Sequence, residues 1–379
     1  MNRTFPTRLR LGTCWRTSVM AGHSSALISL CQCLRGELPE RVEWLPLLGL
    51  ANQTLTTPSL IGVVDQFERR IPEDVCAYVR DIHQRNVIRS KRLTAQLEEA
   101  IITLNERGVK PVLLKGATGL VAASNARRPA RLMNDLDLLI EEEQVDVALA
   151  ALASIGYEMD FQAPAGSERW HADLKRPHDV GTIDVHQSAA PGPAYFYRTS
   201  GNILEHSRLA SIGRGSAYIP TATYQALILI IHDQFQDYDY WIGGIDVRHL
   251  LDLRDLSISP EGIDWDQLAA LSPSKLARNA VESQLVALAE LFGVDVPLRM
   301  RRRLIPRLQF KRRLLQARYP FARWPLLAAT FLDYGNYRRG PGAECRGSDK
   351  SGGTSWSMPR SGTLRFILGI AGDQRVGKI

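Results

Sequence analysis

Long apolar runs and paired cysteines are missing from this sequence of 379 residues. Its longest apolar stretches, residues 227–231 and 325–332, are far shorter than the roughly 20 residues that span a bilayer, so they predict core elements. The five cysteines lack the spacings that are typical of zinc sites and disulfide frameworks. A reducing compartment fits this composition best, so we expect a cytoplasmic protein without a transmembrane segment.

Acidic residues are absent from residues 296–332, which hold nine arginines and Lys311. These ten basic residues exceed the net charge of +7, so the basic character belongs to this segment and not to the surface as a whole. Between residues 299 and 323 the basic residues alternate with apolar ones, which is typical of an amphipathic surface helix. We interpret residues 299–323 as a solvated helix face. Contact with an anionic partner, either a nucleic acid or a membrane surface, stays open.

Acidic residues are also absent from residues 1–36, which contain several arginines. This composition suits a targeting peptide, but the apolar stretch at residues 26–34 is short and is interrupted by Gln32. We therefore favour Met20 as the true start, with the first nineteen residues as a poorly ordered extension, and we assign residues 1–24 to this extension as a unit.

Helical periodicity dominates the two flanks of the chain. Residues 25–108 have helical patterning, and within residues 74–107 apolar side chains such as Val79 and Leu93 recur at helical spacing or its multiples. Later helices are predicted at residues 222–235, 245–256 and 276–292. Residues 341–362 are rich in glycine and serine and predict a disordered linker.

Strand-like and helical segments alternate between these flanks. Strands are predicted at residues 109–114, 136–140, 157–161 and 182–187. Helices are predicted at residues 116–125 and 141–155, and a loop or hairpin at residues 162–179. This order predicts an α+β fold, in which a small core with a mixed sheet is embedded in a mostly α-helical protein. The predicted units are residues 1–24 (extension), 25–108 (N-terminal helical region), 109–190 (α/β core), 191–333 (C-terminal helical domain) and 334–379 (flexible tail).

The α/β core holds two motifs that together indicate chemistry on a nucleoside triphosphate. Asp135 and Asp137 stand two residues apart at the start of an apolar strand, so their side chains point to the same face of the sheet. Paired carboxylates of this kind can hold magnesium. Upstream, Lys115 and Gly116 end another apolar run at a strand-to-helix turn, where a glycine leaves room for a phosphate beside backbone N–H groups.

These motifs resemble the nucleotidyltransferase superfamily, and most closely a bacterial group of uncharacterised nucleotidyltransferases. The features of that group are an L-L-K-G turn, here residues 113–116, and an R-x-x-x-D-x-D-L-L strand, here residues 131–139. The resemblance covers residues 25–290 of the chain. It departs from the wider superfamily at Ala117, where Ser or Gly is usual, and in a longer gap between the turn and Asp135.

The resemblance implies a magnesium-dependent enzyme that transfers a nucleoside monophosphate from an NTP to an acceptor and releases pyrophosphate. It also implies that Asp184, in the run Thr-Ile-Asp-Val-His, is a third catalytic carboxylate, and that Asp135, Asp137 and Asp184 hold two Mg²⁺ ions. The nucleotide-binding residues that it implies are Lys115, Gly116 and Arg131. The acceptor is not indicated, and a small molecule, a protein and an RNA end all stay open.

Simpler interpretations stay open for these residues. Lys115 can lie at a strand end with only its stem buried. Arg131 can pair structurally with one of the aspartates. The scaffold can also serve a non-catalytic accessory protein that binds a nucleotide or another partner.

His232 and Asp233 are similar to the adjacent His-Asp pair of metal phosphohydrolases. That interpretation needs further ligands, for which His249 and Asp252 are available. A histidine on an apolar helix is more often a core residue with its hydrogen bonds satisfied, so we favour the structural interpretation.

Overall fold

The computed structural model describes residues 15–121, 130–165, 170–187, 203–322, 325–326 and 378. The strands are β1 (Val112–Leu113), β2 (Asp135–Leu139), β3 (Glu158–Gln162), β4 (His171–Lys175), β5 (Thr182–His186), β6 (Ser207–Ile212) and β7 (Gly215–Pro220). The helices are α1 (Trp15–Leu34), α2 (Trp44–Gln53), α3 (Ile61–Phe67), α4 (Glu73–Glu106), α5 (Lys115–Val121), α6 (Val145–Ser154), α7 (Ala222–Ile231), α8 (Asp239–Ile242), α9 (Val247–Ile258), α10 (Trp265–Ala270), α11 (Lys275–Phe292), α12 (Leu298–Arg301) and α13 (Leu304–Arg318). The predicted α+β class is confirmed.

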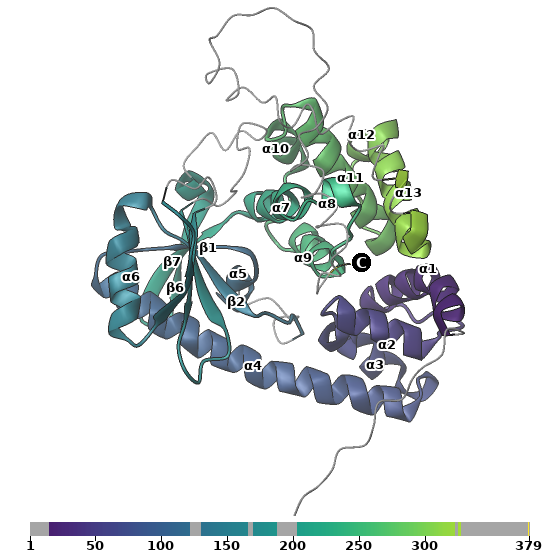
Figure 1. The fold of residues 1–379 in the computed structure, drawn as a ribbon, viewed down its shortest axis with the longest axis horizontal. Coiled ribbons are helices and arrows are strands. Elements are labelled where there is room, and N and C mark those ends of the chain that lie inside the picture. Colours follow the sequence, from purple (N-terminus) through teal and green to yellow (C-terminus); the bar gives the residue numbers. More distant parts are fainter. Residues whose placement is uncertain are drawn as a thin grey trace, which may run out of the picture.

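The strands form one mixed sheet in the order β3-β4-β5-β2-β1-β7-β6. β2 pairs in parallel with β5, and β1 pairs in parallel with β7, whereas the other neighbours pair antiparallel. α4 and α6 share a hydrophobic core with one face of the sheet. Figure 1 shows α7 and α9 on the other side of the sheet from α6.

Alternation along β2 and β5 divides their side chains between two environments. Leu136, Leu138 and Val185 are buried in the core that α4 and α6 cover. Asp137 and Asp184 hold the alternate positions, so they point to the opposite face, toward α7 and α9. The alternation that buries the apolar side chains in the core therefore also places both carboxylates on the opposite face of the sheet.

α4 is a 34-residue helix that takes part in two hydrophobic cores. Val75 and Val79 pack with the helices α1 to α3 and α7 to α13, whereas Leu97 and Leu104 pack with the sheet. In Figure 1, α4 runs from beneath the sheet to beneath α2 and α3. At 1.5 Å per residue it is roughly 50 Å long, so one helix fixes the helical region relative to the sheet.

Three strands were not predicted from the sequence. β4 lies in residues 162–179, which were expected to form a loop or hairpin, and it pairs with both β3 and β5. β6 and β7 form a hairpin inside residues 191–333, which were expected to be helical; its turn contains Gly213 with φ of +55°. These strands are stabilised by pairing with neighbouring strands, which leaves only a weak local signal in the sequence.

The outer parts of the predicted units lie outside the described residues. These are residues 1–14 of the expected extension and most of the expected tail, of which Lys378 alone is described. α1 begins at Trp15, within the expected extension. Among the described residues, no helix combines the length and the apolar character that crossing a membrane requires.

The basic segment does not form one solvated face, which corrects the sequence interpretation. Arg312 and Arg313 of α13 are 9% and 1% exposed. Arg312 donates to the backbone carbonyls of Tyr240 and Trp241, and Arg313 donates to Gln234 and Gln284. These acceptors compensate the Nη groups for lost water, whereas the buried Nε of each arginine has no hydrogen-bond partner among the described residues.

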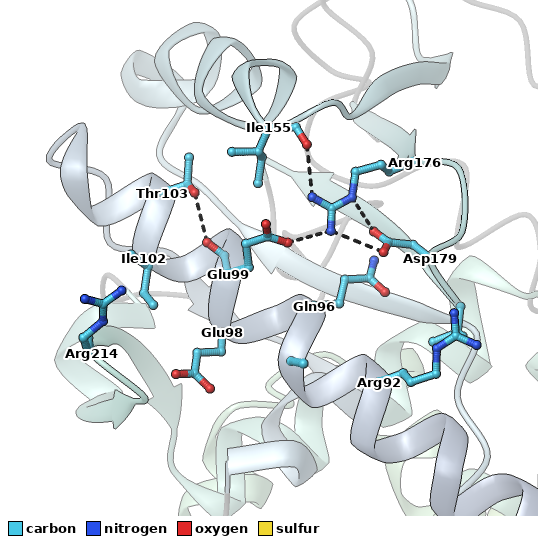
Figure 2. A pocket seen from close by; sticks show the side chains of 12 residues that line it. Arg92, Gln96, Glu98, Glu99, Ile102, Thr103, Ile155, Arg176, Asp179 and Arg214 are labelled. Atoms are coloured by element: carbon cyan, nitrogen blue, oxygen red, sulfur yellow. Dashed lines mark hydrogen bonds and ion pairs between the residues drawn. The ribbon is translucent and has the colours of Figure 1, made fainter.

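Arg176, directly after β4, ties three parts of the α/β core together (Figure 2). Its Nη2 lies 2.6 Å from Glu99 of α4, its Nε lies 3.0 Å from Asp179, and its Nη1 donates to the carbonyl of Ile155 at 3.0 Å. The guanidinium also stacks over the ring of Tyr157. The cavity of about 680 Å³ beside these residues therefore has a structural ion pair in its wall.

Replacement of Arg176 by methionine is expected to lower the free energy of unfolding by about 2 kcal/mol. The substitution removes the charge that compensates Asp179, whose side chain is 17% exposed, and it frees the end of α6 from α4. Urea unfolding followed by circular dichroism measures the change. Arg214→Met is the control, because Arg214 lines the same cavity but is exposed. Equal losses in both variants would contradict the structural role.

Candidate active site

The structure brings together the three aspartates that the sequence singled out. β2 and β5 pair in parallel with Asp137 opposite Asp184, and Asp135 begins β2. One carboxylate oxygen from each residue lies within 4.8 Å of the others. Carboxylates that are far apart in the sequence thus meet because two parallel strands are in register.

Asp137 is the buried centre of this carboxylate cluster, with 2% of its surface exposed. Its Oδ1 accepts a hydrogen bond from Lys115 Nζ at 2.7 Å and lies 2.9 Å from His186 Nε2. Burial alone would raise the pKa of this carboxyl, but the Lys115 ammonium and His186 hold the pKa well below its usual range. Asp137 is therefore a carboxylate at neutral pH.

Asp184 has the opposite electrostatic character. Burial, and then the charges of Asp137, Asp135 and Asp173, raise its pKa to about 7. A hydrogen bond from the Thr182 hydroxyl, at 2.9 Å, opposes this shift. Three carboxylates that repel one another in a buried place are the oxygen donors that Mg²⁺ prefers, so the residues present fit this ion.

Lys115 opens α5 in a backbone conformation that is rare for a residue with a side chain, with φ of +45°. This conformation aims its ammonium at Asp137, and the charges of Asp137, Asp135 and Asp184 together outweigh burial and raise its pKa. The next residue must be small, because a Cβ at Gly116 would collide with the guanidinium of Arg131.

Arg131 is held by a residue from the helical domain. Its Nε lies 3.0 and 2.9 Å from the two carboxylate oxygens of Asp252 on α9, and its Nη2 lies 2.9 Å from one of them. The pairing with an aspartate that the sequence left open is thus made to Asp252, and not to Asp135 or Asp137. It joins the site to the helices across a sequence distance of 121 residues.

A cavity of about 710 Å³ lies where the α/β core meets the helical domain. Lys115, Gly116 and Arg131 line it from the core, and Gln225 of α7 and Asp252 of α9 line it from the helices. Its size is in the range of small-molecule and cofactor sites. All three residues predicted to contact the nucleotide therefore face one cavity.

Asp173 and His171 of β4 are additional polar residues beside the carboxylates that the sequence analysis missed. Asp173 lies opposite Asp184 in the antiparallel register, and His171 lies opposite His186 at a ring distance of 6.1 Å. Asp173 Oδ1 is buried and accepts no hydrogen bond from the described residues, although His171 Nε2 lies 3.9 Å away. Alternation in the run His-Ala-Asp-Leu-Lys, with Ala172 and Leu174 buried, is the signal that could have revealed them.

The second cluster of potential metal ligands is His232, Asp233 and His249, whose ligand atoms lie within 4.8 Å of one another. His249 Nδ1 lies 2.6 Å from Asp233 Oδ1. Asp252, which the phosphohydrolase interpretation offered as a further ligand, pairs with Arg131 instead. His232 and Asp233 begin a π-helical turn at residues 232–236, directly after α7, and His249 lies on α9.

Comparison with known proteins agrees with this geometry. A family model described as "Uncharacterised nucleotidyltransferase" matches residues 40–293, which is more than half of the chain. No curated protein and no solved structure matches the chain.

Proposed function

Because the chain belongs to the family of uncharacterised nucleotidyltransferases, we propose that it transfers a nucleoside monophosphate from an NTP to an acceptor in a magnesium-dependent reaction. The observation that carries this proposal is the convergence of Asp135, Asp137 and Asp184 on two neighbouring parallel strands. We further propose that Lys115 and Arg131, which line the adjoining cavity, attract the triphosphate.

The transfer replaces one bond to phosphorus with another. An oxygen of the acceptor bonds to the α-phosphorus, the bond to the oxygen that bridges the α- and β-phosphates breaks, and pyrophosphate leaves with the bonding electrons. Asp135, Asp137 and Asp184 would hold Mg²⁺, which supplies positive charge to the triphosphate and the acceptor oxygen.

The protein's own side chains prepare this step. Lys115 and His186 keep Asp137 ionised inside the fold. Asp252 fixes the guanidinium of Arg131 at two points, so Arg131 enters the reaction already oriented. Asp184 has its pKa near neutrality and lies beside the other two carboxylates, where it can accept the proton that the acceptor releases.

The direct test of the proposed function is incubation with each labelled NTP and a cell extract, with and without Mg²⁺. The proposal expects label on an extract component, pyrophosphate release, and loss of both when Mg²⁺ is removed. Magnesium-dependent NTP binding with no pyrophosphate release from any NTP would support the alternative, a non-catalytic binding protein on the same scaffold.

Magnesium is expected to raise the melting temperature more at about pH 8 than at about pH 6. The folded-state pKa of Asp184, about 7, lies above the ordinary value of 3.8, so the folded protein keeps a proton there that the unfolded chain releases. The contribution of this proton to the stability of the fold is present at low pH and is lost as pH rises through 7. Mg²⁺ competes with that proton, so it restores stability at the higher pH, where Asp184 is ionised. Differential scanning fluorimetry measures the shift; a pH-independent Mg²⁺ effect, or an unchanged one in Asp184→Asn, would contradict this assignment.

A further inference from the structure

The helical domain encloses the ammonium group of Lys378 in a cage of acidic side chains. Lys378 Nζ lies 2.6 Å from Asp239 Oδ2, 2.7 Å from Asp237 Oδ2 and 3.8 Å from Asp233 Oδ1. The side chains of Asp233 and Asp239 are each 1% exposed. We call Asp233, Asp237 and Asp239 the acid cage. It is built by the π-helical turn after α7 and by the start of α8.

The acid cage holds three carboxyl groups, and its fixed cationic neighbours are His249 and the buried guanidinium of Arg313, which interacts with Asp233 and Asp239. His249 Nδ1 lies 2.6 Å from Asp233 Oδ1 and compensates that carboxylate. His232 lies 3.3 Å from Asp237, but burial and the charge of Lys115 lower its pKa, which favours the neutral form. Asp239 Oδ1 is buried and accepts no hydrogen bond from the described residues. The cage therefore requires a cation, and an ammonium with its three donors suits several oxygens at once.

Two helices connect the acid cage to the candidate active site. On α9, His249 stands one helical turn before Asp252, which binds Arg131. On α7, Gln225 lines the cavity beside the carboxylates, and His232 follows seven residues later on the same face. The two places are also linked electrostatically, because the charge of Lys115 helps to lower the pKa of His232, which lies 3.3 Å from Asp237 of the cage.

We propose that the acid cage binds a primary ammonium group of the acceptor, and that Lys378 occupies the cage when no acceptor is bound. This inference rests on the proposed nucleotidyl transfer and narrows its acceptor to an amine-bearing molecule. Lys378 offers the chemical group that the acceptor would present, and its backbone carbonyl accepts a hydrogen bond from Gln53 of α2 at 2.9 Å. Because the acceptor must displace Lys378, removal of this side chain opens the cage.

The cage is tested first without any nucleotide, by the melting temperature of Lys378→Ala. We expect this variant to melt below the wild type, and n-butylammonium, which has the four-carbon chain and the ammonium group of a lysine side chain, to raise its melting temperature with concentration. The wild type should not respond, and neither n-butanol nor sodium chloride should replace the amine. Asp239→Asn in the Lys378→Ala background should abolish the response, because Asp239 makes the shortest contact to the ammonium.

Two outcomes of that experiment would overturn the inference. One is a response to n-butanol equal to the response to n-butylammonium, which would mean that the site is merely apolar. The other is stabilisation by Mn²⁺ or Zn²⁺ with none by the amine, which would make His232, Asp233 and His249 a metal site.

The acceptor is tested separately with the wild-type protein, so that the result does not depend on a variant that folds poorly. A cell extract is divided, and one half is treated with an amine-selective acetylating reagent before labelled NTP is added. We expect acetylation to reduce label transfer at least about tenfold, since it removes the charge that the cage would bind. Equal label transfer in both halves would contradict the proposal of an amine-bearing acceptor, but it would not contradict the proposed nucleotidyl transfer. No label in either half with any NTP would refute the proposed function, and with it the acceptor.

Discussion

Asp135→Asn is expected to reduce nucleotidyl transfer roughly 1000-fold while the protein stays folded. Asparagine keeps the size of the side chain but removes one of the negative charges that we propose hold the metal ions. Asp135 begins β2 and is only partly buried, whereas Asp137 is 2% exposed and bound to Lys115. The same substitution at Asp137 would therefore disturb both the chemistry and the fold, so Asp135 gives the cleaner test.

The measurement for Asp135→Asn is the rate of pyrophosphate release at saturating NTP, beside circular dichroism and the melting temperature. Asp146→Asn is the matched control, because Asp146 is an exposed aspartate on α6, on the far side of the sheet from α7 and α9. A folded Asp135→Asn protein with transfer within tenfold of the wild type would show that the carboxylate cluster does not carry the reaction.

Lys115→Met is expected to lower the free energy of unfolding by about 3 kcal/mol. Methionine preserves most of the stem but removes the ammonium from Asp137, whose side chain is 3% exposed. Among the described residues, His186 then remains as its ion-pair partner. An uncompensated buried carboxylate is costly, so the lost stability is due to the charge of Asp137 as much as to the missing ammonium of Lys115.

The origin of that loss is measured by a double-mutant cycle with Asp137→Asn. The double variant should regain most of the stability that Lys115→Met loses, because a neutral amide no longer needs the ammonium. Lys110→Met is the control, since Lys110 is exposed and lies just before β1. Additive losses in the double variant would mean that Lys115 stabilises the fold through contacts other than Asp137.

The sequence was sufficient for the part of the site that rests on alternation along a strand. Asp135 and Asp137 had to share a face because they stand two residues apart on β2. The long α4 was predicted within one residue at each end, because its apolar side chains recur with helical spacing over 34 residues. Local periodicity was thus enough to predict both the long helix and the shared face of the paired carboxylates.

Contacts between distant segments could not be obtained in this way. Nothing near Arg131 in the sequence indicates that Asp252, 121 residues later, binds its guanidinium. Asp173 was missed because residues 162–179 contain glycine, proline and charged residues, which predict a loop or hairpin, whereas β4 is stabilised by pairing with β3 and β5. The burial of Arg313 likewise depends on the amide oxygens of Gln234, in the π-helical turn after α7, and of Gln284 on α11. These features follow from the packing of whole elements, which no short window of sequence encodes.

The most direct test of the account is the position of manganese in crystals grown with Mn²⁺ and a non-hydrolysable NTP analogue. Anomalous diffraction should show the ion roughly 2.1 Å from carboxylate oxygens of Asp135, Asp137 and Asp184, with the phosphates of the analogue beside Lys115 and Arg131. Manganese bound only at His232, Asp233 and His249, or an analogue bound away from the three aspartates, would contradict it.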